Sequence, residues 1–387
     1  MPRLRTLGDA RAVVFACLFA SQSALLVLSP ALVEVARDLG VSTATAGQLR
    51  SISGAAGGVT AIVLATMARR AGLRELLSAG ATLLAAGSGV SAAAPSFTVL
   101  AIAQAVSGVG IGLLIAVGIA AAGEWPAPAE RPHVLAWAIA GMPAAWIAGM
   151  PVVAAVADWR AAWVVVPGAA SLLALALVRT RPPDAPSRRT GDAVGAWRRP
   201  ELARFAAGEL LANAAWAAVL TYSGALLIES YAISPPVAAL GLGLMATAML
   251  PGTFTARRGA AHATPARLAA LTALQAAAVL ALSELRWGFG ITLALLAAMA
   301  FVNGHRSMTA SAVGMGSAPD DRVAAMSMRA AANQLGYLLG AASGGLALAV
   351  GGFSALGVTL AALFASAALV HAPSLTHANP VPREVTA

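Results

Sequence analysis

Apolar runs long enough to cross a membrane recur along this whole 387-residue chain. A helix rises about 1.5 Å per residue, so roughly 20 residues cross a hydrocarbon core of about 30 Å. Only 11% of the residues are charged, far below the proportion typical of soluble domains. The sequence therefore predicts an all-α integral membrane protein. Its twelve predicted transmembrane helices cover residues 12–36, 46–68, 76–94, 97–122, 133–157, 161–178, 202–228, 236–255, 266–284, 287–313, 323–349 and 353–370.

The basic residues lie between the apolar runs and are not gathered in one domain. All 25 are arginines. With the N-terminus in the cytoplasm, twenty of them, including Arg329, lie on that side, against four outside, including Arg50, and Arg306 within a span. Because cytoplasmic loops carry the excess of basic residues, both termini are predicted in the cytoplasm of a multi-pass cell (inner) membrane protein. A nucleic-acid partner is not expected.

The N-terminal apolar run is predicted to be a retained first helix. It is too long for a signal peptide, and further spans follow it. Cys17, the single cysteine, lies within this run, which excludes a disulfide framework and a thiolate metal site. We expect no metal and no cofactor.

One polar segment, residues 179–200, holds six arginines and four prolines. It predicts a cytoplasmic linker between an N-terminal six-helix half (1–178) and a C-terminal six-helix half (201–387). Equivalent loops repeat, because an Ala-Arg-Arg triplet recurs after 188 residues, and Arg131 and Arg322 are 191 residues apart. Parallel six-helix repeats with a substrate site between them are a transporter architecture. Two pseudo-symmetric six-helix bundles are therefore expected.

Deep polar residues concentrate in the first, fourth, seventh and tenth predicted helices. Such side chains are costly in a bilayer and usually face a bundle interior or a water-filled cavity. Every third helix is therefore predicted to line a substrate pathway. The polar residues of these helices are Gln22, Gln104, Glu209, Asn213, Asn303, His305 and Arg306.

The fifth predicted helix carries the pattern G-x7-G-M-P, followed by D-W-R-A-A-W at residues 158–163. Through this motif the chain resembles the major facilitator superfamily, in its twelve-helix drug and metabolite efflux (arabinose efflux permease-like) branch. The resemblance implies that the fifth and eighth helices pack between the halves. Gly141, Ala145 and Gly149, spaced by four, would form a flat face for this approach, and Pro151 would bend the helix end.

Other family motifs are altered. The family loop after the second helix has the pattern G-x3-D-R-x-G-R-R. Here Arg69 stands where the family has aspartate, and Arg70, Gly72 and Arg74 complete the predicted gating loop. A fourth-helix arginine, implicated in proton coupling in the family, is Gln104 here.

The eleventh helix matches the family better. Gly336, Gly340 and Gly344 are spaced by four and are predicted to pack on the second helix, where Gly54 and Gly58 repeat the spacing.

Glu209 and Arg306 are the candidates for proton coupling in place of the missing arginine. Both lie roughly 10–15 Å from the cytoplasmic ends of their helices. A carboxylate and a guanidinium at equal depth can pair, and protonation of the acid would release the arginine. The alternatives are a structural ion pair, or a Glu209 that only extends to the cytoplasm. A lone His305 is more often a packed residue than a proton carrier.

Trp146 and Trp216 lie near the middle of their predicted helices, where an indole serves either core packing or the wall of a ligand pocket. With Gln22, Asn213 and Asn303 at similar depth, the pocket would be largely apolar. It suits an amphiphilic organic molecule better than a sugar.

Motifs of intramembrane or soluble enzymes, such as H-E-x-x-H and a Walker loop, do not occur. We expect a monomeric, proton-coupled efflux carrier of a small amphiphilic molecule, with the substrate, protons and the bilayer as partners. The alternatives are an uptake carrier for an organic anion bound by Arg306, and a non-transporting membrane protein on the same scaffold.

Overall fold

The computed structural model describes residues 2–67, 72–127, 129–180, 199–258, 263–317 and 322–372. They form helices joined by short loops, with helices at all twelve predicted positions. The elements are α1 (Pro2–Asp38), α2 (Thr43–Met67), α3 (Leu73–Ala93), α4 (Phe97–Glu124), α5 (Arg131–Val156), α6 (Trp159–Trp163), the π-helix η1 (Val164–Gly168), α7 (Ala169–Thr180), α9 (Pro200–Tyr231), α10 (Pro235–Arg258), α11 (Pro265–Glu284), α12 (Phe289–Ser317) and α13 (Arg322–His371).

Ten stretches of the described residues are long and apolar enough to cross a membrane. The longest, Met328–His371, is broken at Gly351 and Gly352 and therefore supplies two of the predicted spans. Gly352 has a φ of 65°, a left-handed backbone that favours glycine. The more polar α2 is not among the ten stretches, although it packs within the bundle. The predicted all-α membrane fold is confirmed, with about eleven apolar spans.

Two prolines lie inside α5. Pro143 and Pro151 do not end this helix, which continues to Val156. In a soluble helix interior each proline would cost about 3 kcal/mol, whereas in a membrane bundle neighbouring helices compensate for the lost hydrogen bond. The chain then turns at Ala157, whose φ is 50°. Asp158 begins the next helix by accepting a hydrogen bond from the backbone N–H of Ala161 at 2.6 Å.

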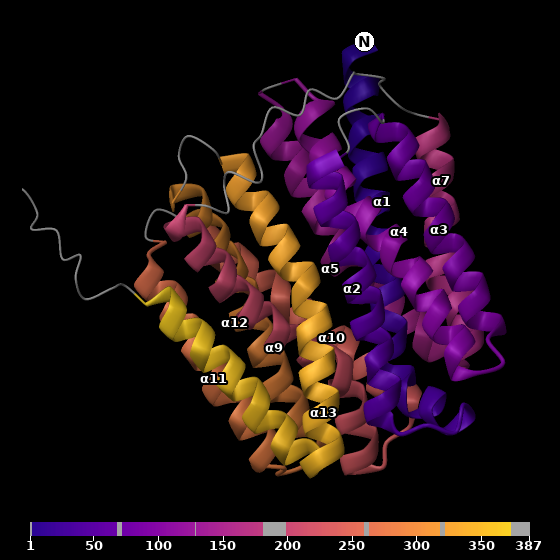
Figure 1. The fold of residues 1–387 in the computed structure, drawn as a ribbon, viewed down its shortest axis with the longest axis vertical. Helices are drawn as coiled ribbons and strands as arrows, with labels where there is room; N and C mark the ends of the chain where they lie inside the picture. The colour runs from indigo at the N-terminus through magenta and orange to yellow at the C-terminus, as the bar shows by residue number, and fades with distance from the viewer. Residues whose placement is uncertain are drawn as a thin grey trace, which may run out of the picture.

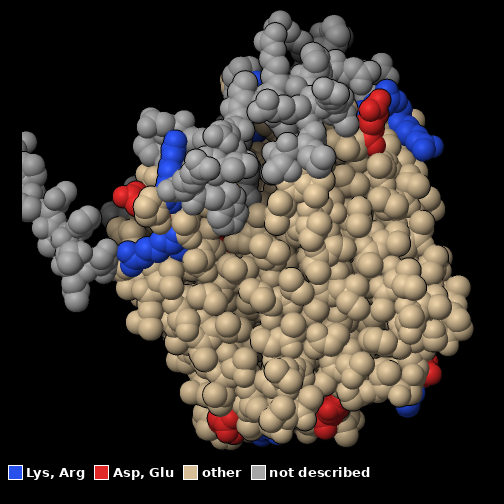
Figure 2. Space-filling view, viewed as in Figure 1, with Lys and Arg blue, Asp and Glu red and all other residues tan. Residues whose placement is uncertain are grey.

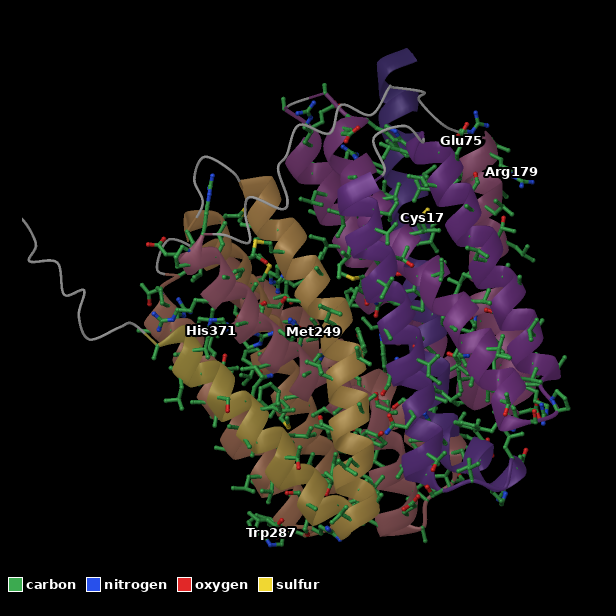
Figure 3. All side chains as sticks on the ribbon, viewed as in Figure 1. Cys17, Glu75, Arg179, Met249, Trp287 and His371 are labelled. Carbon is green, nitrogen blue, oxygen red and sulfur yellow. The ribbon has the colours of Figure 1, made fainter. Side chains whose placement is uncertain are left out.

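The helices before residue 180, here called the N-terminal set, lie beside the helices after residue 199, the C-terminal set (Figure 1). Between the sets, α2 packs on α13, α5 on α10 and α1 on α9. We call the end of the bundle at which α1 begins the first end, and the opposite end the second end. Glu75 and Arg179 lie at the first end and Trp287 at the second (Figure 3). A broad band without visible charge separates the two ends, as a lipid-facing surface requires (Figure 2).

Candidate functional site

A carboxylate with two arginines lies inside the C-terminal set. Glu209, nine residues into α9, is 0% exposed, and Arg306 of α12 is 1% exposed. Nη1 of Arg306 donates to Oε1 of Glu209 at 2.6 Å. The pairing that equal depth allows in the sequence therefore exists in the fold.

Sequence reasoning missed two further members of this group. Arg329 of α13 donates from Nε to Oε2 of Glu209 at 2.7 Å, and from Nη2 to the hydroxyl of Ser307 at 2.9 Å. His371, at the end of α13, places Nε2 3.6 Å from Oε1 of Glu209 (Figure 3). A signal for Arg329 was present, because it lies inside the predicted span 323–349, where a charged residue marks a functional site. From the sequence, Arg329 was counted only as one of the cytoplasmic-side arginines, whereas the fold places it within α13 and against Glu209.

We call Glu209, Arg306, Arg329 and His371 the charge cluster. It joins α9, α12 and the two parts of α13, which lie before and after the break at Gly351 and Gly352. A single carboxylate faces two guanidinium groups, so its ionisation holds three segments of chain together. Protonation would leave both arginines without a carboxylate, and a buried charge that loses its partner is strongly destabilising. The carboxylate of Glu209 therefore links α9 to α12 and α13.

Two of the predicted substrate amides adjoin the charge cluster. Nδ2 of Asn213 donates to the backbone carbonyl of Glu209 at 2.7 Å. Oδ1 of Asn303 accepts from Nε of Arg306 at 3.5 Å and from Nε2 of Gln275 at 3.4 Å. Both amides are buried. They extend the polar network of the cluster across α9, α11 and α12.

Another predicted pair lies in the N-terminal set. Nε1 of Trp146 on α5 donates to Oε1 of Gln22 on α1 at 3.4 Å, and both side chains are buried. Trp216 on α9 is half-buried and packs against the hydrophobic core. These residues belong to helices that contact the other set, because α1 packs on α9 and α5 packs on α10.

Two predicted residues point elsewhere. Nε2 of Gln104 donates to the hydroxyl of Ser91 at 3.0 Å, so this side chain faces α3. Nε2 of His305 lies 2.6 Å from Nη2 of Arg267 on α11. The deep polar residues therefore form several groups instead of the single lining that their periodicity predicts.

The small-residue face of α5 packs on α1. A Cβ atom on Gly141 would lie 2.6 Å from the carbonyl oxygen of Phe15, and one on Gly149 would lie 2.7 Å from Cδ2 of Leu26. The expectation that Gly141, Ala145 and Gly149 provide the face toward the eighth helix is therefore wrong. Spacing by four identifies a face for close approach but does not identify its partner.

α5 does pack on the eighth helix, α10, as the family resemblance implies, but through its neighbouring residues. The Cβ atom of Met150 would lie 3.1 Å from a Cβ built on Gly243, and Cδ of Pro151 would lie 3.9 Å from it. Pro151 therefore belongs to the contact between the sets.

The glycine face of α13 shows the same pattern. Gly336, Gly340 and Gly344 face α9, where they lie against Ala214 and Ala218, whereas α2 packs on an adjacent face of α13 that includes Tyr337. α2 and α13 therefore pack as expected, but these three glycines do not form that contact.

Comparison with known proteins decides the family. A sequence model described as Major Facilitator Superfamily matches residues 14–317. This chain belongs to the major facilitator superfamily. It is therefore a membrane transporter of the secondary class and not an enzyme. A search of curated proteins finds no match.

Several solved transporter structures share the fold at low sequence identity. A D-xylose–proton symporter has a TM-score of 0.73 at 16% identity, covering 94% of this chain and 96% of its own. A bacterial homologue of the human lysosomal transporter Spinster, in an inward-facing and unoccupied conformation, has a TM-score of 0.72 at 14% identity, covering 95% of this chain and 94% of its own. The nucleoside transporter NupG has a TM-score of 0.70 at 14% identity, covering 95% of this chain and 98% of its own. These similarities show the fold alone.

The superfamily loop motif is partly visible. Arg69 and Arg70 lie outside the described residues. Gly72 precedes α3 and has an extended backbone. Nη2 of Arg74 donates to the carbonyl oxygen of Arg179, so α3 and α7 are joined at the first end of the bundle. A gating role for these residues stays a prediction.

Proposed function

We propose that this transporter couples proton movement to the efflux of a small amphiphilic organic molecule by alternating access. The observation that supports this most directly is the charge cluster, in which a fully buried carboxylate holds two arginines and adjoins a histidine. Glu209 is the proton-binding group, and Arg306 and Arg329 are the groups that its charge restrains.

Protonation of Glu209 removes the charge that ties α9 to α12 and α13. The arginines then interact more weakly with these helices, which lowers the cost of rearranging the C-terminal set. The substrate site lies between the sets and is largely apolar, because the polar side chains of Gln22, Asn213 and Asn303 bond to partners within their own sets. A largely apolar site favours an amphiphile over a sugar.

The alternative of an anion bound by Arg306 has less support. Nη1 of Arg306 already donates to Glu209, and its Nε lies near Asn303.

Proton coupling itself has a precedent in the fold, since one similar structure is that of a D-xylose–proton symporter.

We further propose a monomer in the cell (inner) membrane, with two halves, 1–178 and 201–387, joined by a cytoplasmic linker at 179–200. The first end of the bundle then faces the cytoplasm. The excess of arginine in the loops at this end supports the orientation.

The experiment uses purified protein in proteoliposomes with an imposed pH gradient and a panel of fluorescent amphiphiles of positive, neutral and negative charge. The wild type should accumulate at least one probe against its concentration gradient. Glu209→Gln should still exchange that probe but lose accumulation. Glu201→Gln is the matched control, because Glu201 is exposed in the first turn of the same helix. Driven accumulation by Glu209→Gln, or none by the wild type with any probe, would contradict the proposal.

A further inference from the structure

A second buried arginine, Arg50, has no such partner. It lies two turns into α2 and is 1% exposed. Among the described residues, none of its three guanidinium nitrogens has a hydrogen-bond partner. Arg306 is equally buried but is neutralised by Glu209. The charge count from the sequence assigned Arg50 to the external side of the membrane, whereas in the fold it is buried within the bundle.

The surroundings of Arg50 come from both sets of helices. Its guanidinium carbon lies 5.8 Å from the ring centroid of Tyr337 on α13. Tyr222 of α9 lies against Gly47, one turn away on α2. Phenol groups from α9 and α13 therefore lie near Arg50 or its helix turn. A tyrosine face attracts a cation but offers no full negative charge.

A second unpartnered donor lies one turn along α13 from Tyr337. The side chain of Gln334 is buried, and its Nε2 has no acceptor among the described residues. Residues three apart share a helix face, so Gln334 and Tyr337 point in the same general direction. Neither the guanidinium of Arg50 nor Nε2 of Gln334 has a hydrogen-bond acceptor among the described residues. A carboxylate supplies two acceptor oxygens in the geometry of the guanidinium fork.

A contact between the two sets lies next to Arg50, on the side toward the second end of the bundle. The carbonyl oxygen of Ala341 accepts from the hydroxyl of Tyr222 at 2.8 Å and from Nε2 of Gln48 at 3.3 Å. Gln48 belongs to the N-terminal set and Ala341 to the C-terminal set, so this bond joins the two sets. It lies on the second-end side of Arg50, where it holds α2 and α9 to the same carbonyl of α13.

We propose that Arg50 binds a carboxylate of the transported molecule, which makes the substrate a small amphiphilic organic acid. This inference rests on the proposed transport function and names its substrate class. The rings of Tyr222 and Tyr337 contact the apolar body of the acid. A bound carboxylate neutralises Arg50 at the junction of the two sets, which stabilises the loaded carrier relative to the empty one and favours its passage between states.

The test measures thermal unfolding of the purified full-length protein in detergent with a thiol-reactive dye. Cys17 is the only cysteine and is buried, so it reacts when the protein unfolds. Benzoate and cyclohexanecarboxylate should raise the melting temperature, whereas their neutral amides should not. Arg50→Gln should weaken carboxylate binding about 10- to 100-fold, the usual effect of losing a charged hydrogen-bond partner. Arg37→Gln is the control, because Arg37 is an arginine exposed at the second end.

Two further measurements separate the possible causes of failure. Glu209→Gln should keep the carboxylate-dependent shift even though it loses proton-driven accumulation, so the two proposals fail independently. Without any added acid, Arg50→Met should be at least as stable as the wild type, since it removes an unpaired buried charge. The proposal is overturned if neither acid stabilises the wild type more than its amide, if Arg50→Gln keeps the full shift, or if Arg50→Met is clearly destabilised.

Discussion

Replacing Glu209 by methionine tests the charge cluster through stability, without a known substrate. The substitution conserves much of the side-chain volume but removes the carboxylate that pairs with Arg306 and Arg329. Breaking a buried ion pair by removing one partner typically costs about 3–5 kcal/mol, because the other charge stays buried. Arg306, 1% exposed, should account for most of that cost. Arg329 should contribute less, because it is 22% exposed and keeps its bonds to Ser307.

The companion variants rank the members of the cluster. Arg306→Met should cost less than Glu209→Met, because Arg329 still neutralises the carboxylate at 2.7 Å. The double variant Glu209→Met/Arg306→Met should cost less than the sum of the two single variants, by about 1–3 kcal/mol, as residues in contact usually do. Exposed Glu201→Met on the same helix should change stability by less than about 1 kcal/mol.

The assay is unfolding of purified protein in a fixed detergent, followed by the reaction of Cys17 with the thiol dye. The expected order of stability is the Glu201 variant first, then the Arg306 variant, then the Glu209 variant. Additive effects in the double variant, or a Glu209 variant as stable as the Glu201 control, would refute the view that this carboxylate holds the helices together.

Two predictions concern packing and orientation. Gly340→Ala should destabilise the protein by about 1–3 kcal/mol through overpacking, because its Cβ would overlap α9. Gly89→Ala, which meets open space, should not destabilise it, and equal melting temperatures for the two variants would contradict the packing argument. In a Cys17→Ser background, a cysteine at Ser96 should be labelled by an impermeant reagent only from outside intact cells. A cysteine at Glu201 should be labelled only from the cytoplasm, and the reverse pattern would overturn the proposed orientation.

The helices could be predicted from the sequence because each membrane span must satisfy its own backbone hydrogen bonds. An apolar run of sufficient length is therefore a helix regardless of its neighbours, and even Pro143 and Pro151 did not change the outcome. The charge cluster could be predicted only in part. Glu209 and Arg306 share a depth, but depth along a helix does not say which helices are adjacent. His371 enters the cluster because α13 turns back at its glycine break, a tertiary fact without a local signal.

The glycine faces show how the internal repeat appears in three dimensions. Gly141 and Gly149 on α5 correspond to Gly336 and Gly344 on α13 at one constant offset of 195 residues. The α5 face packs on α1, and the α13 face packs on α9. Each set of helices therefore contains the same close-packed pair, at equivalent positions of the repeat.

This placement changes what a bulky substitution should do. If these glycines formed the surface between the two sets, a leucine there would hold the sets apart and stop transport in a folded protein. Because they pack within a set, leucine at Gly149 or Gly340 separates two helices of one bundle. Its first effect should be on the stability of that bundle. The contacts between the sets lie elsewhere, at the junctions of α2 with α13, of α5 with α10 and of α1 with α9.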